Sequence, residues 1–541
     1  MKIPLISKFL RYKKRQYLRQ VIRGYKHLKE SNRLGLISSV KETLTNTRIS
    51  QIEKNTSKRI FGAGLHDREL IIRQYLLMRL GGLNLNRALL YSLGNQNSSV
   101  IYPLPPAWRC VLREYGFKVP KVRTKLIWQA YVFLFFVNGL LYLVRQSLSN
   151  FKSIISRSER KFLGEYIYFD GIVEGCLPQA SKDGISHDLL SWYLQWPGRI
   201  KDIDTLCHSV STTREIELNS IQVTSIPSPI LPLSKLTSVF FYFAWSIIVT
   251  LHAIYDFFLG HWWNIVLLKE SSIAAIVRIE QPERLAREYL FNNSNWIYRP
   301  LWTYEAEKAG SKITFYFYST NCESFKLADN YPNITYGWQA MNWPHYLVWD
   351  DYQKDFVNRA VGESAKVSIV GSIWFNTSSL KIPKLESKAI AIFDVTPFRT
   401  AHYVTMGAEI EFYTPDVCEK FLEDIQELAS TLGYQVLWKR KRKIGMLAHP
   451  EAIYFNECYS NVANVMSIDS DISAYRVIES ADIVVSMPYT STAILARELG
   501  KPSCFYDPLG VIQQGDRAAH GIEVLSGKEC LGNWFNIILN G

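Results

Sequence analysis

Residues 482–500, DIVVSMPYTSTAILARELG, contain the strand–turn–helix unit that decides the fold. The apolar run Ile483–Ser486 has the length of a buried strand, and a pattern typical of a helix follows it after a short turn. A strand that leads at once into a helix is typical of a parallel sheet. Thr490, Ser491 and Thr492 place hydroxyl groups at the start of the helix, where unpaired amides and the helix dipole favour an anion. We therefore expect a phosphate to bind there, with simple capping of the helix as the alternative.

The same alternation of strands and helices continues along most of the chain. A polar linker at 375–388 divides it into two blocks. Strands are expected at 99–104, 166–169, 205–210, 215–226, 273–279, 313–318, 346–349 and 367–370 before the linker, and at 389–393, 435–439, 483–486 and 503–506 after it. The sequence therefore predicts the α/β class, with Rossmann-like domains at 96–374 and 389–541 and a basic helical region at 1–95. Ligands of such sheets bind at the carboxyl ends of the strands, so we expect the site in the cleft between the domains.

Two further groups of residues in the C-terminal block favour an anionic ligand. Five consecutive cations, residues 439–443, follow a predicted strand and would concentrate negative charge in a cleft. Another strand ends at an aspartate with an arginine nearby, and arginine can hold a phosphate through two hydrogen bonds. The alternatives are a solvated basic loop with an incidental histidine, and a capping aspartate with a surface arginine. The predicted ligand-binding residues of these groups are Lys439, Arg440, His449, Pro450, Asp394, Thr396 and Arg399.

Charge and hydropathy both indicate a membrane surface as a partner. The net charge is +13, and residues 1–30 hold ten Lys or Arg and one acid, interleaved with apolar residues. This pattern is typical of a basic amphipathic helix on an anionic lipid surface. Leu126–Val144 and Leu236–Leu259 are apolar and each about 20 residues long, enough to cross a bilayer. Because both interrupt one α/β domain, we expect helices that lie at the interface, with burial and spanning as alternatives.

The composition excludes several classes of protein. An apolar fraction of 48% and a charged fraction of 21% are those of a globular chain rather than a disordered one. The eight cysteines are scattered without a CxxC pair, so we expect neither a structural zinc site nor a disulfide framework. The basic residues come without a nucleic-acid motif, and no secretory signal peptide is expected. Asp469 and Asp471 have the spacing of a metal-binding pair, but we expect them to cap a helix, so no metal is predicted.

The order of two short motifs resembles that of a known group of enzymes. His449-Pro450, followed by Ser491-Thr492, resembles the HP and SS/ST motifs with which bacterial sialyltransferases grip CMP. Pro488-Tyr489-Thr490-Ser491 resembles the PFTS motif of a family of bacterial surface-polysaccharide proteins, with Tyr489 in the Phe position. That family is similar to transferases of nonulosonic acids. The resemblance implies a GT-B fold, a CMP-activated donor such as CMP-pseudaminic acid, inversion at the sugar carbon, and no metal or other cofactor.

An inverting transfer needs a base that takes the proton of the acceptor hydroxyl. We expect the N-terminal domain to supply it, because that domain faces the donor. The first choice for the base is Asp188, which could act alone or with His187. His208 is an alternative partner for Asp188. The structural alternative is that Asp188 only stabilises the start of its helix. The acidic motif that supplies the base in sialyltransferases has only a fragment here, Asp170-Gly171. Asp170, Glu305 and Glu307 are the rival candidates.

These features predict a peripheral enzyme on the cytoplasmic face of a bacterial inner membrane. Its partners would be a nucleotide-sugar donor, a glycan or lipid-linked glycan acceptor and an anionic membrane surface, with no nucleic acid. Another donor is the second hypothesis: CMP-Kdo, a nucleotide-diphosphate sugar or CDP-glycerol would use the same phosphate-binding residues. The third hypothesis is a non-catalytic assembly factor that keeps the GT-B shell.

Overall fold

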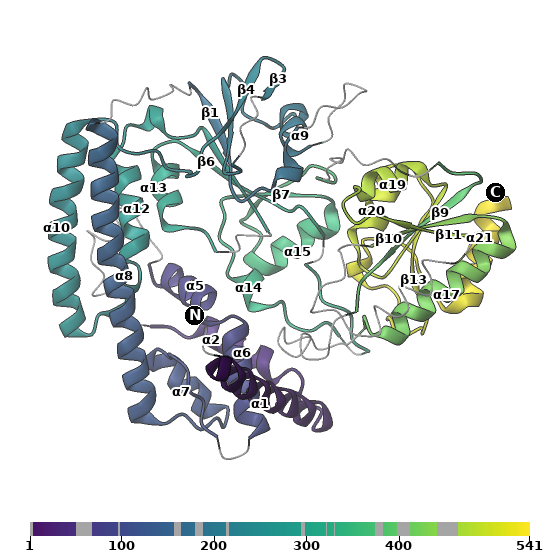
Figure 1. The fold of residues 1–541 in the computed structure, drawn as a ribbon, viewed down its shortest axis with the longest axis horizontal. Coiled ribbons are helices and arrows are strands. Elements are labelled where there is room, and N and C mark those ends of the chain that lie inside the picture. Colours follow the sequence, from purple (N-terminus) through teal and green to yellow (C-terminus); the bar gives the residue numbers. More distant parts are fainter. Residues whose placement is uncertain are drawn as a thin grey trace.

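The computed structural model describes residues 4–540 except 50–67, 96–97, 156–163, 179–187, 212–215, 294–297, 321, 329, 374–381, 383, 398–411, 441–461 and 463. Figure 1 shows three regions: a helical layer at the N-terminus, a large domain around one sheet, and a smaller C-terminal domain around a second sheet. The C-terminal domain packs against one side of the large domain, and a pair of long helices covers another side.

The sheet of the large domain has eight strands in the described residues, in the order β3-β4-β2-β1-β5-β6-β7-β8. Neighbouring strands are parallel except β3 and β4. The order reverses at the central strand β1, because β2 follows on one side of it and β5 on the other. The strands are β1 (Tyr166–Phe169), β2 (Thr205–His208), β3 (Ile216–Leu218), β4 (Ile221–Ser225), β5 (Glu288–Asn292), β6 (Lys312–Tyr316), β7 (His345–Val348) and β8 (Lys366–Ile369).

The second sheet has six parallel strands in the described residues, in the order β11-β10-β9-β12-β13-β14. Its order reverses between β9 and β12. The elements are β9 (Ala389–Asp394), α17 (Pro415–Leu432), β10 (Gln435–Arg440), β11 (Val465–Ile468), α19 (Ala474–Ser480), β12 (Ile483–Ser486), α20 (Ser491–Glu498), β13 (Ser503–Asp507), β14 (Val524–Ser526) and α21 (Gly527–Asn540). The predicted fold class, two Rossmann-like domains in the GT-B arrangement, is confirmed.

Two predicted strands are wrong. Residues 99–104 form no strand, although Val100 and Leu104 are fully buried. Ile273–Ile279 belongs to helix α12 (Leu268–Ile279), which follows the short helix α11 (Trp262–Val266). A short apolar run fits a buried helix as well as a buried strand, and periodicity alone does not separate them. The strand that the sequence places at 273–279 is instead β5, which follows helix α12 and whose residues are all buried.

The N-terminal layer consists of α1 (Pro4–Glu30), α2 (Leu36–Asn46), α5 (Arg68–Leu80), α6 (Leu83–Gly94) and α7 (Pro106–Glu114). Helix α1 crosses α6 so closely that a Cβ atom on Gly24 would lie 1.9 Å from the carbonyl oxygen of Leu90. The apolar stripe Val21, Tyr25 and Leu28 is 0–5% exposed. The apolar stripe of this part of the predicted amphipathic helix is therefore a protein contact.

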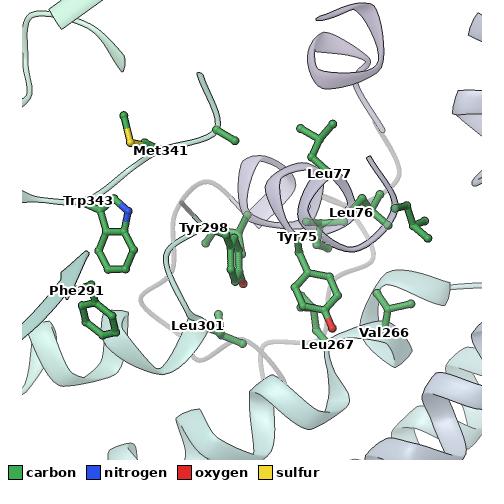
Figure 2. Packing of buried hydrophobic residues seen from close by; sticks show 14 of the residues in the cluster. Tyr75, Leu76, Leu77, Val266, Leu267, Phe291, Tyr298, Leu301, Met341 and Trp343 are labelled. Carbon is green, nitrogen blue, oxygen red and sulfur yellow. The ribbon is translucent and has the colours of Figure 1, made fainter. Parts of the chain in front are cut away.

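Helix α5 attaches the N-terminal layer to the large domain. Figure 2 shows Tyr75 of α5 beside Val266 and Leu267, with Tyr298 and Leu301 next to it. The rings of Tyr75 and Tyr298 meet edge to face with centroids 5.7 Å apart. Each fully buried apolar side chain of this kind contributes roughly 1.5–3 kcal/mol. The layer and the large domain therefore share one hydrophobic core.

The long helices α8 (Lys121–Ile155) and α10 (Leu236–Leu259) run side by side along the edge of the large domain (Figure 1). Both are long and apolar enough to cross a membrane. Only 22% of the most apolar stretch of α8 and 33% of that of α10 is buried. They are therefore not core helices.

Candidate functional site

A cavity of about 410 Å³ lies between the two domains. Its C-terminal wall is formed at the carboxyl ends of β9 and β10 and by the turn after β12, where the strand order of the second sheet reverses. This is where an open parallel sheet binds its ligand. The opposite wall comes from two segments of the large domain, Val173–Cys176 and Tyr318-Ser319, together with Ile373. The cavity therefore faces both domains, as the sequence predicts for the site.

Six of the predicted ligand-binding residues line this one cavity. They come from the ends of three different strands, which explains why they are far apart in the sequence: Asp394, Lys439, Arg440, Thr490, Ser491 and Thr492. Thr396 is half-buried near the end of β9 but does not line the cavity. Arg399, His449 and Pro450 lie outside the described residues, and their predicted roles remain predictions.

Asp394 and Arg440 form a buried pair of opposite charges in the cavity wall. They occupy paired positions on β9 and β10. Asp394 is 3% exposed and Arg440 8%, yet Asp394 Oδ1 and Arg440 Nε and Nη2 have no hydrogen-bond partner among the described residues. Burial raises the pKa of Asp394, and the nearby Arg440 opposes this shift. A buried polar group without a partner costs about 1–3 kcal/mol, so these atoms are suited to a ligand that supplies the missing bonds.

Lys439 brings a second cation to the same wall. Its Nζ donates to the carbonyl oxygens of Arg440 and Ser470, both at 2.8 Å. An ammonium group has three donors, so a ligand can accept the third bond. Burial lowers the pKa of Lys439 to about 8. The ammonium is therefore positively charged at neutral pH but close to the range in which it loses its proton.

The hydroxyl groups at the start of α20 hold the turn together. Thr490 Oγ1 donates to the carbonyl oxygen of Met487 at 2.9 Å, and Thr492 Oγ1 lies 3.0 Å from Thr490 Oγ1 and 2.8 Å from Ser486 Oγ. Ser491 Oγ accepts a bond from the amide of Thr320 at 3.1 Å. Thr490 therefore does not cap the helix with its side chain, although it is the N-cap residue. The start of α20 suits an anion, because the amides and the dipole of a helix's first turn favour negative charge.

Tyr489 is a structural residue of the turn rather than part of the cavity wall. Its φ of 65° lies in the left-handed region, which costs a non-glycine residue roughly 1–2 kcal/mol. Its hydroxyl donates to Asp516 Oδ2 at 2.7 Å, and its ring lies 4.8 Å from that of Phe325. These contacts hold Tyr489 away from the cavity, so the structure gives no support to its predicted donor contact.

The described residues that were predicted first as the base, Asp188 and His208, do not line the cavity. Asp188 is fully buried at the start of α9 (Leu189–Gln195), where Oδ1 accepts from the amides of Leu190 and Ser191 at 2.9 and 3.0 Å. It is therefore the N-cap of that helix, which was the structural alternative. His208 is also fully buried, and burial lowers the pKa of its imidazole. His187 lies outside the described residues.

Asp170, a rival candidate, has a more suitable position. It directly follows β1, where the strand order of the large sheet reverses, and its amide donates to the carbonyl oxygen of Leu290 at 2.9 Å. The chain then turns at Gly171 and enters Val173–Cys176 in the cavity wall. The other rivals form ion pairs: Glu305 lies 2.7 Å from Arg278, and Glu307 pairs with Arg299. Asp170 does not line the cavity itself, but it is the acid of this set that lies in the chain between the central strand and the cavity wall.

The sequence reasoning missed the loop before α19. Ser470, Asp471, Ile472 and Ser473 line the cavity beside Lys439. Asp469 Oδ1 accepts from the amide of Asp471 at 2.8 Å, so Asp469 stabilises the loop while Asp471 is exposed. The spacing of the two aspartates predicts a helix cap, whereas the N-cap residue of α19 is Ser473. Within the part of the chain that the structure describes, no group of three His, Cys, Asp or Glu residues is placed to hold a metal ion.

Polar contacts join the two domains around the cavity. Thr320 of the large domain contacts Ser491, as described above. Asp516 Oδ2 accepts from the amide of Lys326 at 2.8 Å, and Asp516 Oδ1 accepts from the hydroxyl of Tyr331 at 3.1 Å. His520 Nδ1 lies 2.7 Å from Asp350 Oδ2. Lys326 and Tyr331 therefore reach from the large domain onto the C-terminal domain.

Comparison with known proteins gives one family and several similar folds. Residues 247–535 match a family described as polysaccharide biosynthesis PFTS motif proteins. The UDP-GlcNAc 2-epimerase of Methanocaldococcus jannaschii aligns with a TM-score of 0.36 and 9% identity, over 70% of this chain and 92% of its own. The wall teichoic acid polymerase TagF aligns at 0.33 and 11%, over 73% and 88%, and the glycotransferase of kitacinnamycin at 0.32 and 11%, over 70% and 91%. No curated protein matches the chain by sequence.

Proposed function

The chain belongs to the family of polysaccharide biosynthesis PFTS motif proteins, and we propose that it is an inverting, metal-independent glycosyltransferase. The donor would be a CMP-activated nonulosonic acid, with pseudaminic acid as the first choice. The acceptor would be a sugar hydroxyl of a surface polysaccharide or a lipid-linked glycan. One observation supports this proposal above the others: buried atoms of Arg440 and Asp394 that have no hydrogen-bond partner among the described residues share a cavity with Lys439 and the start of α20.

Of these groups, Arg440, Lys439 and the start of α20 fit the phosphate of the donor. Arg440 and Lys439 bring positive charge on side chains that are 8% and 5% exposed, and the helix start adds amide donors. As the bond between the sugar carbon and the phosphate oxygen breaks, the charge on the leaving CMP rises. The same groups then stabilise the transition state more than the bound donor.

The acceptor would enter from the side of the large domain. Its hydroxyl oxygen forms the new bond to the sugar carbon, CMP leaves with the electrons of the old bond, and the hydroxyl proton passes to a base. We propose Asp170 as this base in place of Asp188, because Asp170 follows the central strand and precedes the cavity wall, whereas Asp188 caps a helix.

The test is a panel of activated sugars, measured with and without EDTA. The purified protein should release CMP from CMP-pseudaminic acid or a related CMP-nonulosonate when an acceptor is present, and EDTA should not change the rate. Arg440→Gln should lower the rate at least 100-fold, because one well-placed charged donor is typically worth that much. Arg287→Gln serves as the matched control, since Arg287 lies 52% exposed on the surface and pairs with Glu165.

Other results would replace the proposal. Selective turnover of CMP-Kdo, a nucleotide-diphosphate sugar or CDP-glycerol would keep the fold and change the donor. A requirement for a divalent metal would contradict the metal-independent mechanism. If no activated sugar binds and Arg440→Gln leaves polysaccharide production in cells intact, the chain is an assembly factor instead.

A further inference from the structure

The outer faces of α8 and α10 form one continuous apolar surface without a protein partner in the described structure. We call it the α8–α10 face and define it by six side chains that are 50–82% exposed: Phe133, Leu134, Leu141, Phe241, Leu251 and Phe258. Soluble proteins rarely expose contiguous apolar patches of this extent unless the patch binds something.

We propose that the α8–α10 face binds an anionic lipid bilayer, with both helices lying in the plane of one leaflet. The proposal concerns where the protein sits, and it does not depend on the reaction proposed above. It assigns the membrane contact to this face rather than to the apolar stripe of α1, which packs against α6.

The charges on the two helices favour lipid over a second copy of the chain. Every exposed charged side chain on α8 is a cation: Lys121, Arg123, Lys125, Arg145 and Lys152. The acid of α10, Asp256, is buried and accepts from Asn264 at 2.8 Å. An anionic headgroup layer complements such a surface, since each nearby cation adds attraction. A symmetric dimer through the same face would bring cations toward cations.

The packing of the inner faces favours helices in the plane of the membrane over spanning helices. The inner side of α8 contacts the rest of the domain through Trp128, whose ring meets that of Trp262 with centroids 5.2 Å apart. A Cβ atom on Gly139 would lie 2.8 Å from the side chain of Leu268, so the helices touch closely. On α10, the hydroxyl of Tyr242 lies 2.6 Å from Ser272 Oγ. Because α11 and α12 cover these inner faces, lipid can reach only the outer ones.

Flotation with lipid vesicles tests the proposal on the full-length protein. It should float with phosphatidylcholine vesicles that contain phosphatidylglycerol, and less with phosphatidylcholine alone. Leu134→Glu, Phe241→Glu and Leu251→Glu, combined, should lower the bound fraction more than tenfold. The matched control changes two apolar side chains elsewhere, Val511→Glu and Ile537→Glu, which are 54% and 70% exposed. It should bind like the unchanged protein.

Three further measurements separate the alternatives. Neutralising Lys121, Arg123 and Lys125 to Gln should weaken binding to the anionic vesicles by about fivefold per charge. A wash with alkaline carbonate should release the protein, and resistance to the wash would show spanning helices and overturn the in-plane arrangement. The lipid assignment is wrong if the unchanged protein does not bind vesicles. It is also wrong if light scattering shows that the unchanged protein is a dimer and that the triple glutamate variant is a monomer. CMP release in detergent should be equal in all of these variants. If the lipid-binding proposal is wrong, the proposed reaction is therefore unaffected.

Discussion

At the scale of single residues, the proposed role of Lys439 in donor binding predicts that this binding depends on pH. Its pKa of about 8 lies below the ordinary value of about 10.4, so the folded protein loses this proton while an unfolded chain still holds it. Raising the pH from about 8 to about 10.4 therefore increases the contribution of Lys439 to the stability of the folded state. The same change removes the positive charge with which Lys439 would bind the phosphate. We expect the affinity for CMP to fall about tenfold from pH 7 to pH 9. Calorimetric titration of Lys439→Met should give weaker binding at pH 7 and a flatter profile; an unchanged slope would exclude Lys439 as its source.

Two aspartates allow a direct comparison of catalysis and stability. Asp170→Asn should leave the Kd for CMP unchanged and lower the rate of transfer by about 10²–10⁴, because the proton acceptor is lost. Asp188→Ala should lower the free energy of unfolding by about 1 kcal/mol, because the helix cap is lost, with little effect on the rate per folded molecule. Stopped assays and urea unfolding measure the two effects. The reverse outcome would return the role of base to Asp188.

At the scale of elements, the crossing of α1 and α6 depends on glycine. A Cβ atom on Gly94 would lie 2.0 Å from the carbonyl oxygen of Gln20, and backbone of a packed helix has no room to move. Gly94→Ala should therefore lower the free energy of unfolding by about 1–3 kcal/mol, although alanine favours helices by about 1 kcal/mol. Gly532→Ala on α21 is the control, since its Cβ would meet only the side chain of Leu428 at 3.5 Å. It should be neutral or stabilising in the same urea experiment; equal loss in both variants would exclude the crossing as the cause.

The elements also show how far sequence patterns reach. The four predicted strands after the linker were found because each is an apolar run that ends at a polar turn. Strand β5 was missed because its first residue is a glutamate. In the structure Glu288 is fully buried, accepts from the hydroxyl of Tyr193 at 2.6 Å and pairs with Lys312 at 3.0 Å. Those partners come from other elements, so the local sequence carries no sign that this acid belongs inside.

The same limit applies to the site. The cavity-lining residues of the C-terminal domain were predictable because β9, β10 and β12 end at one edge of one sheet. The role of Tyr489 was not, because it depends on Asp516 and Phe325, which are distant in the sequence. An aspartate in the loop just before a helix can either cap that helix or act in an active site. The residue type and position of Asp188 therefore do not separate the two roles. Its role depends on how the large domain places α9 relative to the cavity, which no local pattern records.

At the scale of the whole molecule, Asp516 contributes to the contact between the two domains. Its carboxylate accepts from Lys326 and Tyr331 of the large domain and from Tyr489 of its own domain, and each hydrogen bond is worth about 1 kcal/mol. Asp516→Ala should therefore separate one cooperative thermal transition into two, as followed by calorimetry. Glu498→Ala is a milder control, because Glu498 accepts one exposed interdomain bond from the amide of Ser372. A single transition in Asp516→Ala, shifted as a whole, would show that other contacts couple the domains.

The close fit of α1 on α6 also has a consequence for synthesis on the ribosome. The chain makes the stripe of Val21, Tyr25 and Leu28 first, and it makes the helix that covers this stripe only after α2 and α5. During that interval the nascent polypeptide carries a cationic helix with a bare apolar side. A chaperone or bilayer close to the exit tunnel can therefore contact this apolar side before α6 packs against it in the folded protein.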